Sequence, residues 1–141
     1  MVVLDTNVVS EVMRSPADGP VADWIASKSL DELSITAVTL AEVLYGIRLL
    51  PAGRKRNELA RKFQKFLSRG FGNRILSFDH DAAGHYAAIM VQRRRMGRQV
   101  KELDAMIGAI TLARSADLAT RNTGDFTDCG VRLINPWKEV G

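Results

Sequence analysis

Near the N-terminus the sequence reads Val2-Val3-Leu4-Asp5-Thr6-Asn7, in which three apolar residues are followed directly by an acid. A short apolar run rich in β-branched residues is typical of a strand that is buried on both faces of a parallel sheet. We therefore predict a strand over residues 2–4, with Asp5 at its carboxyl end.

Strand-like and helix-like segments alternate along the rest of the chain. Further strands are predicted over residues 33–36, 74–78, 118–120 and 131–134. Helices are predicted over residues 8–14, from Pro20, over 39–50, around 59–70, from 79 to about 97, and over 102–115. This order predicts an α/β fold in three layers, α/β/α, with a mainly parallel central sheet. No linker or repeat interrupts the pattern, so we expect a single domain over residues 1–141.

Composition and charge narrow the possible classes of protein. The 141 residues are 46% hydrophobic, which argues against disorder, and 20 basic against 16 acidic residues give a net charge of +4. That modest excess is compatible with a polyanionic substrate. A single cysteine, Cys129, favours a reducing compartment. We expect a cytoplasmic protein, because no signal peptide or run of about 20 apolar residues is seen.

Four acids that are distant in the sequence are predicted to meet at one edge of the sheet. Asp5 follows the first strand, Glu42 lies in the first turn of the helix after residues 33–36, Asp104 opens a helix, and Asp125 follows residues 118–120. Open parallel sheets bind ligands in the crevice beyond the carboxyl ends of their strands. The sequence therefore predicts an acidic site at this edge.

Crowded carboxylates repel one another and would take up protons, unless a cation neutralises them. Mg²⁺ and Mn²⁺ prefer oxygen ligands, and Mg²⁺ retains several waters while using few carboxylates. A bound ion of this kind can generate hydroxide and hold a phosphate oxygen. The chemistry indicated is hydrolysis of a phosphodiester bond.

Each acid taken alone also has an ordinary structural explanation. Asp5 is a suitable helix N-cap, and Asp104 in a first turn is favoured by the helix dipole. Asp125 lies in a typical turn sequence. Glu42 points away from the predicted core stripe of its helix, which is formed by Leu40, Val43, Leu44 and Ile47. Only their joint placement favours a functional site.

Taken in order, several short motifs make the chain resemble the PIN domain, and more closely the VapC toxins of bacterial type II toxin–antitoxin pairs in the FitB-like branch. The motifs are Asp5-Thr6-Asn7, Thr39-Leu40-Ala41-Glu42 leading to Tyr45-Gly46, Asp104-Ala105-Met106-Ile107-Gly108-Ala109, Leu118-Ala119-Thr120-Arg121-Asn122 with Asp125-Phe126, and Leu133-Ile134-Asn135-Pro136-Trp137. The resemblance spans essentially the whole chain. It departs from the family pattern at Leu103 and Gly108, which puts substrate preference in doubt more than activity.

The resemblance implies a PIN-like fold and a role for each site residue. Asp5, Glu42, Asp104 and Asp125 would be catalytic and would bind Mg²⁺ or Mn²⁺. The residues implied to orient these acids or to face the substrate are Thr6, Asn7, Thr120, Arg121 and Asn122. It also implies an RNA substrate, a homodimer, and a VapB-type antitoxin through which the toxin reaches promoter DNA.

Basic and aromatic residues are less specific. Arg121 and Arg14 are predicted near the site edge and are candidates for contacting RNA, whereas Arg93-Arg94-Arg95 and the basic stretch over residues 54–65 are interpreted mainly as solvated helix surface. Aromatic residues form 6% of the chain, and no stacking platform for single-stranded nucleic acid is predicted.

Two alternative functions remain open. An aspartyl phosphotransferase would fit an acid that ends an apolar strand, although Asn7 stands where a second Asp is usual and no positioned lysine is identified. A catalytically silent PIN-like binding module is the alternative outside enzymes. A phosphoenzyme assay and a Mn²⁺ titration distinguish these from the nuclease.

Overall fold

The computed structural model describes residues 1–14, 19–71 and 74–138. Along the chain its elements are β1 (Val2–Leu4), α1 (Thr6–Met13), α2 (Pro20–Ala26), η1 (Leu30–Glu32), β2 (Leu33–Thr36), α3 (Ala37–Leu49), α4 (Arg54–Phe66), η2 (Leu67–Phe71), β3 (Ile75–Leu76), α5 (His80–Arg95), α6 (Glu102–Ala113), β4 (Asp117–Ala119), α7 (Thr123–Phe126) and β5 (Leu133–Ile134). The predicted alternation of strands and helices is confirmed.

The five strands form one sheet in the order β3-β2-β1-β4-β5, and every pairing is parallel. β1 is central: Val3 pairs with Ser34 of β2 on one side and with Leu118 of β4 on the other. The first strand to be predicted therefore lies in the middle of the sheet.

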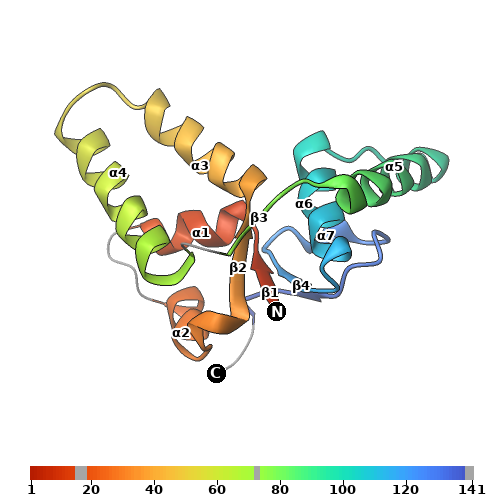
Figure 1. Cartoon of the computed structure of the whole chain (residues 1–141), viewed down its shortest axis with the longest axis horizontal. Coiled ribbons are helices and arrows are strands. Elements are labelled where there is room, and N and C mark those ends of the chain that lie inside the picture. Colours follow the sequence, from red (N-terminus) through yellow and green to blue (C-terminus); the bar gives the residue numbers. More distant parts are fainter. Residues whose placement is uncertain (15–18, 72–73, 139–141) are drawn as a thin grey trace.

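Helices cover both faces of the sheet, as Figure 1 shows, with α1 to α4 on one side and α5 to α7 on the other. The side chains of β1 alternate between two hydrophobic clusters. Val2 and Leu4 pack in the cluster beneath α1 to α4, and Val3 packs in the cluster beneath α5 and α6. This period of two is why an uninterrupted apolar strand suits a sheet that is buried on both faces. The three-layer α/β/α prediction is confirmed.

Several helices begin where the sequence supplies a cap. Asp5, Thr36 and Asp79 are the N-caps of α1, α3 and α5, and each side chain accepts a hydrogen bond from a backbone N–H of the first turn. Pro20 opens α2 after Gly19, whose φ of 102° favours glycine. The cap of α1 directly follows β1, and the cap of α3 is the last residue of β2, so both helices start at the carboxyl edge of the sheet.

Several details of the predicted fold are wrong. Glu42 lies in the second turn of its helix and not in the first, because α3 already begins at Ala37. The last strand, β5, covers Leu133–Ile134 instead of 131–134. β3 covers two residues instead of 74–78, because Phe78 leaves the sheet and packs edge-on against Tyr86 of α5, with ring centroids 5.8 Å apart. Leu44 is 43% exposed and does not belong to the core stripe of α3, because the helix packs through Leu40, Val43 and Ile47 and Leu44 lies at the margin of that stripe. Within the described residues, no helix combines the length and apolar character needed to cross a membrane.

Candidate metal-binding active site

All four predicted acids line one cleft of about 480 Å³ at the carboxyl edge of the sheet. They come from four different elements or junctions: the end of β1, α3, α6 and α7. The cleft is lined by Asp5, Thr6, Asn7, Ser10, Glu11, Arg14, Glu42, Lys101, Asp104, Arg121, Asn122, Asp125 and Trp137. The predicted convergence is therefore observed, although the roles of these residues stay predictions.

Asp5 is the most buried of the four acids, with 4% of its surface exposed. One carboxylate oxygen, Oδ1, accepts the backbone N–H of Thr6 at 2.8 Å. The other, Oδ2, accepts the Thr120 hydroxyl at 2.7 Å and the Asn7 amide at 3.3 Å. These bonds fix the orientation of the carboxylate at the floor of the cleft.

The pKa of Asp5 is raised from 3.8 to about 6, chiefly by burial and to a smaller extent by the like charges of Asp104 and Glu42, while the hydrogen bonds from Thr120 and Thr6 oppose the rise. Burial also raises the pKa of Asp104, helped by Asp125 and Glu42 and opposed by Lys101. The four acids therefore repel one another across the cleft. A cation bound among them would relieve this repulsion.

Glu42 is joined to the β1–α1 junction by a hydroxyl contact. The Thr6 hydroxyl donates to Oε1 of Glu42 at 2.6 Å. Behind it lie the hydroxyls of Thr39, 3.1 Å from Thr6, and of Thr36, 3.4 Å from Thr39. Glu42 thus reaches the cleft from α3, in agreement with its predicted position outside the core stripe.

A second set of contacts joins the β1–α1 junction to the segment after β4. The Thr120 hydroxyl donates its proton to Asp5, so its oxygen can accept the N–H of Asn122 at 3.1 Å. Asn7 extends the link, since its Oδ1 accepts the N–H of Arg121 at 3.3 Å. Thr120 itself is fully buried. All five predicted auxiliary residues thus lie in or beside the cleft.

The cleft also contains residues that the sequence reasoning missed. Lys101 and Trp137 line it, and the Arg121 guanidinium lies over the Trp137 ring, 5.1 Å from its centroid. One aromatic side chain, Trp137, therefore lies at the site, although its ring is covered by Arg121 and forms no stacking platform with another aromatic residue among the described residues. A turn positions Trp137 there, because its backbone N–H donates a hydrogen bond to Oδ1 of Asn135 at 3.0 Å. The motif ending in Trp137 was visible in the sequence, but its distance from the acids was not.

The oxygen-rich donor set fits a hard divalent cation. The four predicted acids and Glu11 give the cleft five carboxylates, and no histidine or cysteine is among the lining residues. This set matches the ligand preference of Mg²⁺ or Mn²⁺. Within the described residues, no three acidic, histidine or cysteine side chains are grouped closely enough to hold a metal ion together. Mg²⁺ ordinarily uses one or two carboxylates and keeps several waters, so a loose arrangement of acids suits it.

A second cavity, of about 650 Å³, adjoins the acidic cleft between α1, α3 and α4. Thr6, Ser10, Arg14 and Glu42 line both cavities, so the two are continuous. The second is mainly apolar and extends to Met13, Val43, Ile47 and Leu59. An acidic pocket therefore opens directly onto a hydrophobic groove.

Comparisons with known proteins match this architecture. The PIN domain family model matches residues 2–130. The plasmid stability protein StbB of Pseudomonas syringae pv. tomato is 41% identical over 98% of this chain and 99% of that protein. The VapC ribonuclease Y4jK of Sinorhizobium fredii and the toxin FitB of Neisseria gonorrhoeae are each 35% identical, over 98% and 99% of this chain and 99% and 100% of those proteins. The solved structure of FitAB bound to the IR36 DNA fragment has a TM-score of 0.92 and 35% identity, and covers 100% of this chain and 99% of that chain.

Proposed function

This chain belongs to the PIN-domain family, and from that premise we propose that it is the toxin of a type II toxin–antitoxin pair, a metal-dependent endoribonuclease. Relatives of nearly equal length are named as a VapC ribonuclease and as the toxin FitB, which supports the toxin and nuclease classes. The observation that carries the proposal is the acidic cleft, where four carboxylates from distant elements meet and the pKa values of Asp5 and Asp104 are raised.

In this proposal Asp5, Glu42, Asp104 and Asp125 hold Mg²⁺ or Mn²⁺ at the carboxyl edge of the sheet. When bound, the ion supplies an activated water and neutralises charge on the scissile phosphate. The hydroxyls of Thr6 and Thr120 orient Glu42 and Asp5 through the hydrogen bonds described above.

The cations of the cleft have a separate part in the proposal. Lys101, Arg121 and Arg14 surround the acids and would attract the RNA backbone, which no carboxylate can do. Asn122, beside Asp125, presents an amide to the same cleft. Recognition of RNA and binding of the metal would therefore use different residues of one cleft.

The apolar groove beside the acidic cleft supports a protein partner of the VapB type. A peptide in that groove would lie next to Glu42 and could block access to the acids. Contact with promoter DNA would be made through this antitoxin, as the FitAB–DNA relative suggests. A homodimer is supported by the outer face of α3, where Leu44, Tyr45 and Leu49 are 43%, 67% and 65% exposed.

The decisive test is RNA cleavage by the purified protein. We expect cleavage with Mg²⁺ or Mn²⁺, none with EDTA, and a loss of at least about 100-fold in Asp5→Asn or Asp104→Asn, because the charge that holds the ion is removed. Asp23→Asn, at an exposed position of α2, is the matched control and should cleave normally. Induced expression without the antitoxin should arrest growth with the wild type and not with Asp5→Asn.

Full activity in both variants would contradict the site assignment. Absence of Mn²⁺ binding by calorimetry would favour a silent binding module. The phosphotransferase alternative would use Asp5 as the nucleophile, with Lys101 in the same cleft. It predicts that Asp5 becomes labelled as a phosphoenzyme, and we expect no such labelling.

A further inference from the structure

The three arginines that end α5 do not share one environment. Arg94 and Arg95 are exposed, as expected for a solvated helix end, but Arg93 is only 4% exposed, so that expectation is wrong for Arg93. Its Nη1 donates to the carbonyl oxygen of Thr127 at 2.7 Å and its Nη2 to the carbonyl oxygen of Asp125 at 3.2 Å. The guanidinium therefore holds the backbone of the segment that carries one of the four acids.

Arg93 is an unusual buried charge. Among residues 1–14, 19–71 and 74–138, no carboxylate forms an ion pair with it, and its Nε has no hydrogen-bond partner. Buried charges are costly and are normally paired with an opposite charge. Here the partners of the guanidinium are neutral carbonyl oxygens of Asp125 and Thr127, so Arg93 restrains the backbone of that one segment.

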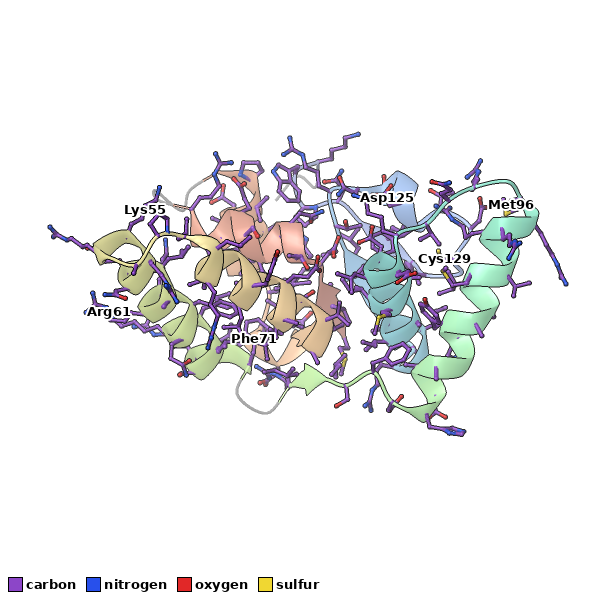
Figure 2. The ribbon with its side chains drawn as sticks, turned by 90° about the horizontal axis from the view of Figure 1, so that it is seen from above. Lys55, Arg61, Phe71, Met96, Asp125 and Cys129 are labelled. Carbon is purple, nitrogen blue, oxygen red and sulfur yellow. The ribbon has the colours of Figure 1, made fainter. Side chains whose placement is uncertain are left out.

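That segment has little regular structure of its own. α7 is a single turn of four residues, and its N-cap, Asn122, makes no side-chain capping bond. The carbonyls at the end of a helix lack intrahelical partners and need other donors. The Arg93 guanidinium supplies two such donors. The Phe126 side chain, 1% exposed, packs in the hydrophobic cluster beneath α5 and α6. Figure 2 shows Asp125 and Cys129 on this segment, beside α5 and α6.

The carboxylate of Asp125 depends on this backbone for its position. Asp125 is exposed, and within the described residues no donor bonds to its side chain. The negative charge of Asp104 faces it across the cleft and repels it. Without a restraint on the backbone, the carboxylate would move away from the other acids.

We propose that Arg93 is a positioning residue that keeps the Asp125 carboxylate at the acidic cleft by clamping the carbonyl oxygens of Asp125 and Thr127. The consequence for catalysis rests on the proposed function, but the clamp itself does not. Loss of the clamp should act through Asp125 and through no other acid.

The test compares Arg93→Met and Arg93→Lys with the matched control Arg94→Met, each with and without Asp125→Asn. Loss of an outer contact to a metal-binding side chain typically costs about 10- to 100-fold. We expect a loss of that size in Mn²⁺ affinity and kcat for Arg93→Met, with little change in KM. Arg93→Lys should recover part of the loss, since an ammonium can donate to one of the two carbonyls. Arg94→Met should match the wild type.

In the Asp125→Asn background, Arg93→Met should lower Mn²⁺ affinity and kcat by less than about a further twofold, because the carboxylate that Arg93 positions is already absent. Hydrogen exchange of the metal-free protein gives a readout that is independent of activity. The N–H groups of Asp125 and Cys129, which donate to Asn122 and Phe126, should exchange faster in Arg93→Met, whereas those of α6 should not.

Equal losses in both backgrounds, or faster exchange throughout α5 and α6, would assign Arg93 a general structural role and overturn the proposal. If Arg93→Met does not fold, Arg93→Lys alone decides, by the same exchange pattern. Failure of the unsubstituted protein to cleave RNA would contradict the proposed function instead, because the exchange comparison needs neither metal nor RNA.

Discussion

Asp5 and Asp125 line the same cleft but are held in place in different ways. Asp5 follows the central strand and is 4% exposed, and its carboxylate accepts three hydrogen bonds, two from the next two residues and one from Thr120. Asp125 is exposed on a single helical turn, whose backbone is fixed by Phe126 and Arg93. The sheet therefore provides one rigid, desolvated acid, and tertiary contacts position a second one on a connecting segment.

The largest expected difference between the two acids concerns stability without metal. The pKa of Asp5 is raised from 3.8 to about 6, chiefly by burial. When the Asp5 carboxylate is ionised in the folded protein, this shift corresponds to a destabilisation of up to about 3 kcal/mol. Above pH 6, ionised Asp5 therefore lowers the free energy of unfolding. As the pH falls from 6 toward 3.8, the folded state takes up a proton that the unfolded state does not, so this penalty disappears.

Asp5→Asn should accordingly stabilise the metal-free protein at pH 7.5 by up to about 3 kcal/mol, and by almost nothing near pH 4. Denaturant unfolding at the two pH values measures the difference. Asp125→Asn is the control, and at its exposed position it should change the free energy of unfolding by less than about 0.5 kcal/mol. Equal effects at Asp5 and Asp125 would show that the two acids are held alike.

The sequence was sufficient to predict the Asp5 side of the cleft. An apolar run that ends at an acid and leads into a helix is a local pattern, and local patterns specify both the strand and the cap of α1. The arrangement of the four acids also followed from sequence, because parallel strands share a carboxyl edge.

The Asp125 side could not be predicted in the same way. Arg93 lies 32 residues before Asp125, and three consecutive arginines carry no signal that distinguishes the buried one from its exposed neighbours. Likewise Trp137 meets Arg121 only through the closure of β5 beside β4. Such contacts depend on how elements pack, which periodicity does not report.

An intermediate effect is expected for Thr120, a buried side chain that contacts both regions. Its hydroxyl donates to Asp5 and accepts the N–H of Asn122. Thr120→Val keeps the shape but removes both bonds, so we expect a loss of about 10- to 100-fold in Mn²⁺ affinity and kcat. The pKa of Asp5 should also rise, because the Thr120 hydrogen bond lowers it. The pH dependence of Mn²⁺ binding should shift upward.

Two variants control for this substitution. Thr120→Ser retains the hydroxyl and should remain near wild-type activity. Thr111→Val removes another fully buried hydroxyl, which bonds the Ile107 carbonyl within α6, and should change neither metal affinity nor kcat. Wild-type Mn²⁺ affinity in Thr120→Val would show that metal binding does not depend on the link that Thr120 forms between Asp5 and the segment after β4.

The smallest expected effect concerns Arg121, a cation that lines the cleft and bonds to neither Asp5 nor Asp125 through its side chain. Arg121 lies over Trp137 with its charge unpaired among the described residues, so the ring orients a guanidinium that is free to contact phosphate. A cation–π contact at an exposed site contributes about 0.5–1 kcal/mol. Trp137→Leu should therefore raise KM for RNA by about two- to fivefold and leave kcat unchanged. The matched control is Lys28→Met, which removes the similar pair of Lys28 with Trp24 on α2 and should not change KM. A change in kcat for Trp137→Leu would place this aromatic residue with the acids and not with substrate binding.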